Sequence, residues 1–211
     1  FGNIVQGVPI DADKNVTGSL LTLLNPYALC VGATTLLLFF LHGLYFVGLK
    51  ADGTVKEEAH RLARRVALPT IAFAAATVVW TTVIAMDREA PALAAVIGCG
   101  VAAALALLGS AVANLRRRDG WAFALGAVTI VGAVLMLWFA LFPYVMPSST
   151  DPANSLTIEN ASSTDYTLGV MTWAAVIFLP GILAYQAWTY WVFRKRISRV
   201  QIEKADAAAA H

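Results

Sequence analysis

The sequence predicts an all-α polytopic membrane protein with five transmembrane helices, on the evidence of its composition and of the lengths of its apolar blocks. Apolar residues make up 59% of the chain and charged residues 13%, against roughly 45–50% and 25% in soluble domains. Five apolar blocks each approach the roughly 20 residues that a helix needs to cross a bilayer. None alternates polar and apolar faces as a helix on a soluble core does. The predicted spans are residues 25–49, 66–86, 91–113, 121–142 and 168–193.

The basic residues predict how these spans are oriented. All but two of the 15 Lys and Arg residues lie in residues 50–65, 116–118 and 194–204, and two apolar blocks separate each stretch from the next. Cytoplasmic loops of membrane proteins carry an excess of Lys and Arg. We therefore expect the loops 50–65 and 114–120 and the tail 194–211 to be cytoplasmic.

The remaining connections are expected on the outer side. Residues 1–24 precede the first span, and the chain begins with Phe1 and carries no signal-peptide pattern. We expect this segment to belong to a longer polypeptide, whose upstream portion holds an odd number of spans or a removed export signal. Residues 143–166 form the longest polar stretch, which is rich in Ser, Thr, Asn and Pro and contains no Lys or Arg. We expect it to be an outer loop.

Two features inside the spans concern packing. Pro180 and Gly181 interrupt the last span and are expected to bend or loosen it. A stripe of small residues in the third span is expected to let a neighbouring helix approach closely. This stripe consists of Gly98, Ala102, Ala106 and Gly109.

The search for chemical motifs finds few candidates and no catalytic residue. Phosphate-binding loops and the common hydrolase and metalloprotease motifs are absent. Cys30 and Cys99 lack metal-ligand spacing and are interpreted as packing residues, so no metal site is predicted. The interiors of the spans contain no Asp or Glu, and hence no carboxylate proton relay.

Two polar side chains inside the spans remain as candidates. His42 lies about 12 Å from the inner end of the first span at 1.5 Å per residue, where it could be a haem ligand, a member of a proton path or a packing residue. Packing is favoured, and haem ligation is least favoured because no second His is available to pair with it. Gln186 in the last span is interpreted as an interhelical hydrogen-bond donor rather than a substrate contact.

Several strings of the chain closely resemble subunit II of the cytochrome bd quinol oxidases. They are spread from the first residue to the last span, in that family's order and spacing. The strings are FGNIVQGVP (residues 1–9), LLNPY (23–27), FPYVMPSST (142–150), SLTIENASS (155–163), MTW (171–173) and YQAWTYWVFR (185–194).

This resemblance implies a fold and an activity. Subunit II of that family is similar in plan to two four-helix bundles plus one extra helix, and this chain resembles the second bundle and the extra helix. The implied function is that of the non-haem subunit of a terminal oxidase in the bacterial cell membrane, with its C-terminus in the cytoplasm. Such an oxidase oxidises quinol and reduces O₂ to water, with proton uptake from the cytoplasm.

The resemblance also implies cofactors and partners. Haems b and d are expected in subunit I, the obligate membrane partner, and this chain is expected to ligate none. Menaquinol or ubiquinol is the expected substrate of the complex. The resemblance allows a structural quinone and small accessory subunits, and nucleic acid is not an expected partner. Position 42 can be Gln in family members, which implies that a hydrogen-bonding side chain is sufficient there.

Two alternatives from other functional classes stay open. Half of a secondary transporter would show internal repeats and broken helices around a midplane site, whereas this chain has one Pro-Gly break and no convincing repeat. A membrane scaffold subunit would show no co-purifying haem and no effect on oxygen consumption.

Overall fold

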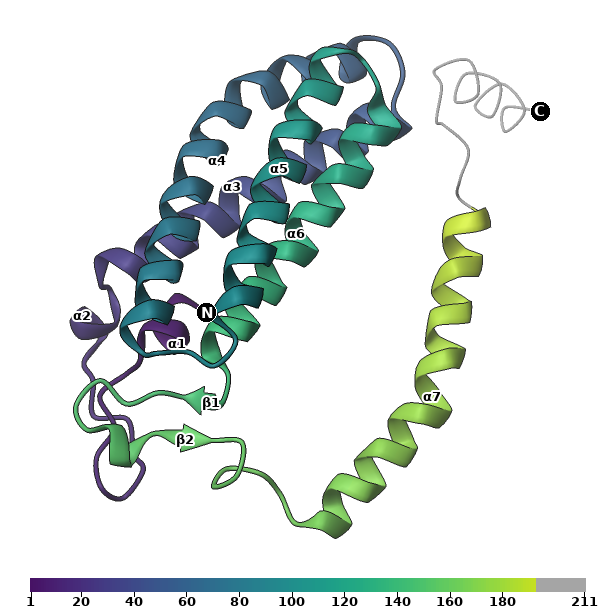
Figure 1. Cartoon of the computed structure of the whole chain (residues 1–211). Coiled ribbons are helices and arrows are strands. Elements are labelled where there is room, and N and C mark those ends of the chain that lie inside the picture. Colours follow the sequence, from purple (N-terminus) through teal and green to yellow (C-terminus); the bar gives the residue numbers. More distant parts are fainter. Residues whose placement is uncertain (193–211) are drawn as a thin grey trace.

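A computed structural model of the chain describes residues 1–192 (Figure 1). Five of its seven helices are long and apolar enough to cross a membrane, so the predicted all-α polytopic class is confirmed. Residue 193 of the last predicted span and the predicted tail 194–211 lie outside the described residues. The five long helices are α3 (Pro26–Lys50), α4 (Thr54–Asp87), α5 (Leu93–Leu115), α6 (Asp119–Leu141) and α7 (Asp165–Val192).

Helices α3 to α6 pack into one four-helix bundle (Figure 1). Short connections at residues 51–53, 88–92 and 116–118 make successive helices antiparallel. Most of the large apolar side chains point outward, as Leu68 and Leu105 do. The bundle core is instead lined mainly by Ala, Gly and Thr, as expected where lipid solvates the outside and helices associate through close packing.

Helix α4 begins well before the predicted span at residue 66, and residues 54–65 form its first three turns rather than a loop. This segment consists largely of strong helix formers, including Glu, Ala, Leu and Arg. At 1.5 Å per residue, 34 residues extend over about 51 Å, well beyond the roughly 30 Å hydrocarbon layer. The charged first turns therefore project from the bundle at what we call the basic end, which comprises residues 50–65 and 114–120.

Of the predicted small-residue stripe of the third span, Ala106 is buried within the bundle, whereas Gly98 and Ala102 are exposed in this chain. The buried face of α5 includes Gly100 and Ala103 instead. A methyl group at Gly100 would lie 3.0 Å from the sulfur of Met136, so α5 and α6 approach closely along this line. Small residues recur at helical spacing on both faces of α5, and spacing alone does not tell which face meets a neighbour.

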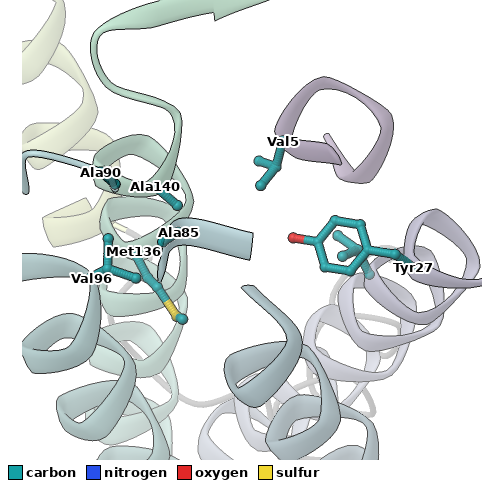
Figure 2. Close-up of a cluster of buried hydrophobic side chains, with 8 residues drawn as sticks. Val5, Tyr27, Ala85, Ala90, Val96, Met136 and Ala140 are labelled. Atoms are coloured by element: carbon teal, nitrogen blue, oxygen red, sulfur yellow. The ribbon is translucent and has the colours of Figure 1, made fainter. Parts of the chain in front are cut away.

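The opposite end of the bundle is covered by residues 1–25 and 143–164, and we call it the capped end. The covering segments contain α1 (Gly2–Gln6), α2 (Leu20–Leu23), β1 (Tyr144–Met146), the 3₁₀ helix η1 (Pro152–Asn154) and β2 (Leu156–Thr157). The Ile10 carbonyl joins the two segments by accepting hydrogen bonds from Thr150 Oγ1 at 2.9 Å and Asn154 Nδ2 at 3.1 Å. Val5 of α1 meets Tyr27, Val96 and Met136 in an apolar cluster at this end (Figure 2).

Helix α7 stands apart from the bundle (Figure 1). None of its residues is buried, and the helix continues through Pro180. The chain therefore forms one bundle and one separate apolar helix, in agreement with the predicted plan of a four-helix bundle plus one extra helix.

Candidate functional site

A cluster of buried polar side chains lies at the basic end of the bundle. Lys56 and His60 come from α4, Asn114 from α5 and Asp119 from α6. The side chains of His60 and Asp119 are 3% and 6% exposed, whereas that of Lys56 is 22% exposed. This basic-end cluster therefore reaches from the surface into the protein interior.

Its contacts form a continuous chain. Lys56 Nζ lies 2.7 Å from Asp119 Oδ2, and His60 Nε2 lies 3.0 Å from Asp119 Oδ1. His60 Nδ1 lies 2.7 Å from Asn114 Oδ1, which can only accept a hydrogen bond. The Nε2 contact is close but is not aligned as a hydrogen bond. Because Nδ1 donates to Asn114, Nε2 of a neutral His60 presents a lone pair to the Asp119 carboxylate, and the two repel. A proton on Nε2 makes the same contact attractive.

Local backbone structure places these side chains. The imidazole packs against α3 at Gly48, where a methyl group would lie 3.7 Å from His60 Nε2, an ordinary van der Waals distance. The α5–α6 turn is tight, with Arg117 at φ 57° and the Arg118 amide donating to the Ala113 carbonyl at 2.9 Å. The turn brings Asp119 into the first turn of α6, where the helix dipole favours a carboxylate.

An exposed ion pair lies beside the cluster. The Arg117 guanidinium donates two hydrogen bonds to the Glu57 carboxylate, at 2.8 and 2.7 Å. The hydrogen bonds to Glu57 raise the pKa of Arg117. Because both groups are exposed to solvent, we assign this pair a small energetic role.

Polar groups continue from this cluster into the bundle. Ser110 lies one turn deeper than Asn114 on the buried face of α5, and its Oγ is 3.4 Å from the hydroxyl oxygen of Tyr45 on α3. Tyr45 and His42 both pack on Gly126 of α6, where a methyl group would lie 2.9 Å from His42 Nδ1 and 3.4 Å from Tyr45 Cδ2. The structure thus brings the predicted candidate His42 and the ring of Tyr45 onto the same glycine of α6.

The environment of His42 is otherwise apolar. Its ring stacks on that of Phe123, with ring centroids 4.5 Å apart. Its Nδ1 is buried and has no hydrogen-bond partner among the described residues. A buried nitrogen without a hydrogen-bond partner costs stability.

A second set of hydroxyl contacts lies toward the capped end. Thr34 and Thr77 are 2.7 Å apart through their Oγ1 atoms, and the Tyr27 hydroxyl lies 2.9 Å from Thr81 Oγ1. Such contacts join α3 to α4 and are typical of interhelical packing in membranes. Between the basic-end and capped-end sets, the core contains apolar side chains, including Leu38, Leu41 and Leu107, together with the buried hydroxyl groups of Thr70 and Thr129.

The second predicted candidate, Gln186, does not lie near the polar side chains of the bundle core. It lies on α7, apart from the bundle, and is exposed. Cys30 and Cys99 are free thiols. Within residues 1–192 there is no group of three or more His, Cys, Asp or Glu side chains arranged to hold a metal ion.

The basic-end cluster was not predicted from the sequence, because residues 50–65 were expected to form a loop. A usable signal was present in the spacing. The buried small residues of α4 recur at intervals of three, four or seven residues, as one face of a helix does, and His60 continues that series toward the N-terminus. The series is His60, Ala63, Ala67, Thr70, Thr77 and Thr81.

Comparisons with known proteins agree with the fold. The family model described as cytochrome bd terminal oxidase subunit II matches residues 1–193. The chain is 35% identical over 202 residues to the cytochrome bd ubiquinol oxidase subunit 2 of Bacillus subtilis, covering 94% of this chain and 58% of that relative. It is 33% identical over 239 residues to the cytochrome bd-I ubiquinol oxidase subunit 2 of Escherichia coli K12, covering 97% and 62%.

A probable cytochrome oxidase subunit 2 of Haemophilus influenzae is 29% identical over 222 residues, which cover 90% of this chain and 58% of that relative. The chain thus spans about three fifths of the length of these curated relatives. With the family match extending over all the described residues and five helices able to cross a membrane, the chain belongs to the cytochrome bd terminal oxidase subunit II family.

Proposed function

We propose that this chain acts as part of the non-haem subunit II of a bd-type terminal oxidase, a complex that oxidises quinol and reduces O₂ to water. The observation that carries the proposal is the family match over residues 1–193. Two of its relatives are named as ubiquinol oxidase subunits. The five helices able to cross a membrane suit a subunit that works within the bilayer.

The basic end faces the cytoplasm in this proposal, and the C-terminus lies on the same side of the bacterial cell membrane. The two cations outside the basic stretches support this orientation, because both are bound to the cap. Lys14 Nζ donates to the Ala153 carbonyl at 3.1 Å. Arg88 donates to the carbonyls of Val5 and Gln6. Each therefore has a local structural reason to lie on the outer side, although Lys and Arg generally favour cytoplasmic loops.

The haems are assigned to a partner, subunit I, because the two described histidines do not suit an axial ligand. His60 Nδ1 is bonded to Asn114, and its Nε2 faces the Asp119 carboxylate at 3.0 Å. The His42 ring is stacked on Phe123, and its Nδ1 is buried against Gly126. The contribution of this chain is then to support the partner, to form a low-dielectric wall and to take part in proton uptake from the cytoplasm.

Purification through a tag on this chain tests the proposal. The detergent-solubilised complex is expected to show haem b and haem d bands in a reduced-minus-oxidised visible spectrum, and to consume oxygen when supplied with quinol. A colourless and inactive complex that still contains an intact partner would contradict the proposal. It would leave a transporter or a scaffold subunit as the function to test.

A further inference from the structure

We propose that His60 is a pH-sensitive clamp. With both ring nitrogens protonated, it holds the first three turns of α4, residues 54–65, against α6, and it releases these turns when the ring loses a proton. The clamp is a property of the bundle itself and goes beyond the proposed function. It lies at the basic end, outside the predicted spans, where the cluster reaches the surface through the partly exposed Lys56.

The first turns of α4 bury few other groups. Within residues 54–65, the buried side chains are those of Ala59, His60 and Ala63. The imidazole is therefore the largest group that this segment buries. Gly53, at the N-cap position, supplies no capping side chain. Helix ends with few buried apolar contacts open most readily, so the docking of these turns depends strongly on His60.

The contacts of His60 favour the doubly protonated ring. Its Nδ1 lies 2.7 Å from Asn114 Oδ1, and its Nε2 lies 3.0 Å from Asp119 Oδ1. Both oxygens present lone pairs, whereas a neutral imidazole carries a proton on only one of its two nitrogens. Either neutral tautomer therefore turns a lone pair toward an oxygen at close range. Only the imidazolium is attracted at both contacts.

These contacts join two helices that lie diagonally across the bundle. Helices α4 and α6 each pack chiefly on α3 and α5, and they touch each other only slightly. The contacts of Asp119 with Lys56 and His60 therefore fasten the beginning of α4 to its diagonal neighbour. Loss of the His60 proton makes one of these contacts repulsive. The other remains, but the Lys56 side chain is 22% exposed and solvent weakens its attraction.

Acidic and basic groups of the neighbouring elements surround the clamp. The carboxylates of Glu57 and Asp119 attract a charged ring, and nearby cations repel it. Helix α3 places the uncharged Gly48 against the ring. The cations are Lys56 and Arg64 of α4 and Arg117 of the α5–α6 turn, and the ionisable residues nearest to Gly48 along the chain are Tyr45, Lys50 and Asp52.

The direction of the pH effect follows from these contacts. Histidine usually changes its charge between about pH 5 and 8. The attraction between a charged His60 and Asp119 is present on the acidic side of this range and is lost as the pH rises. The first turns of α4 are therefore docked at lower pH and released at higher pH.

Amide hydrogen exchange of the tagged complex in detergent tests the inference. Exchange in residues 54–65 would be measured by mass spectrometry at about pH 6 and about pH 8, within the range in which histidine changes its charge. The rates would be corrected for the intrinsic pH dependence of amide exchange. His60→Gln removes the titrating ring. Asp119→Asn keeps the shape of the partner, and its amide can donate to a neutral ring.

We expect the unmodified complex to exchange about tenfold faster in residues 54–65 at the higher pH, which corresponds to about 1.4 kcal/mol, the scale of one hydrogen bond. This difference should disappear in His60→Gln and in Asp119→Asn. His42→Gln is the matched control, because it replaces the other histidine of residues 1–192, and it should keep the difference.

The opposite outcomes are equally clear. Equal corrected exchange at the two pH values in the unmodified complex would overturn the clamp and would indicate that Asn114 turns its amide group toward a neutral ring. A difference that persists in His60→Gln or in Asp119→Asn would overturn it too, because another group would then be responsible. If His60→Gln does not assemble, the unmodified complex and Asp119→Asn decide. None of these readouts uses oxygen consumption, so a failure of the proposed function would leave this test intact.

Discussion

His60 Nδ1 lies 2.7 Å from Asn114 Oδ1, and this contact joins α4 to α5 at a depth where both side chains are only 3% exposed. On its other side the same imidazole faces Asp119 of α6. One side chain therefore connects three of the four helices of the bundle at the basic end, and several consequences of the fold can be tested there and elsewhere.

Removing the Asp119 carboxylate should destabilise the bundle strongly. Asp119→Ala leaves Lys56 and the buried His60 without their common partner, and breaking a buried pair typically costs about 3–5 kcal/mol. Thermal unfolding in detergent, followed by circular dichroism, would measure the loss. Glu57→Ala, which removes the exposed partner of Arg117, serves as the control and should change the midpoint little. Equal midpoints for the two variants would contradict the buried role of Asp119.

Two glycines of α5 should respond oppositely to the same substitution. A methyl group at Gly100 would lie 3.0 Å from both Met136 Sδ and Val78 Cγ1, whereas nothing lies within 4 Å of one at Gly98. Gly100→Ala should lose about 1–3 kcal/mol through overpacking. Gly98→Ala should be neutral or stabilising by up to about 1 kcal/mol, because Ala is the better helix former. Unfolding of both variants in detergent measures the two changes in stability. A larger loss for Gly98→Ala than for Gly100→Ala would place the helix contact on the Gly98 face.

Arg88 should hold the N-terminal segment against the capped end. Its guanidinium donates to the carbonyls of Val5 and Gln6, at the end of α1, and its partial burial lowers its pKa. Arg88→Ala should increase amide hydrogen exchange in residues 1–10. Arg88→Lys should be intermediate, since an ammonium lacks the fork that can reach two carbonyls. Lys14→Ala, which removes an exposed cation, serves as the control. Unchanged amide exchange in Arg88→Ala would show that Arg88 does not hold the N-terminal segment in place.

The proposed orientation predicts opposite labelling at two exposed glutamates. Glu58 lies at the basic end and Glu159 at the capped end. In intact cells, a membrane-impermeant maleimide should label Glu159→Cys and leave Glu58→Cys unlabelled until the cells are opened. Cys30 and Cys99 would first be replaced by Ser. Labelling of Glu58→Cys in intact cells would reverse the topology.

His42→Ala should lower turnover moderately and leave the haem content of the complex unchanged. The reason is that the His42 ring is stacked on Phe123 with its Nδ1 buried against Gly126, a position that does not suit an iron ligand. Quinol-driven oxygen consumption and the visible spectrum of the same preparation provide the measurement. Loss of all haem from an assembled complex would point instead to a ligating or structural role.

Much of the fold could be predicted from the sequence, because a bilayer imposes length and polarity on each segment. Apolar blocks of the right length locate the spans, and five helices able to cross a membrane are found. The boundaries were less predictable. The first turns of α4 are charged, so hydropathy excludes residues 54–65 from a span, although their helix propensity continues the helix through them.

The candidate site was predictable only in part. His42 stands out as a polar residue within an apolar block, and the structure places it beside Tyr45 on Gly126. His60 and Asp119 did not stand out, because they occupy stretches rich in other charges. Their burial depends on how the basic ends of α4, α5 and α6 meet, which no local pattern reports.

The sequence by itself determined the class of this protein, its five apolar spans and its resemblance to an oxidase subunit, since hydrophobic length and characteristic strings are properties of the chain alone. Only the tertiary structure decided which face of α5 meets its neighbours and which polar side chains share the core. Helical periodicity repeats on every face of a helix, so the choice among faces is made by packing. At the basic end, that packing brings Lys56, His60, Asn114 and Asp119 together from three different helices.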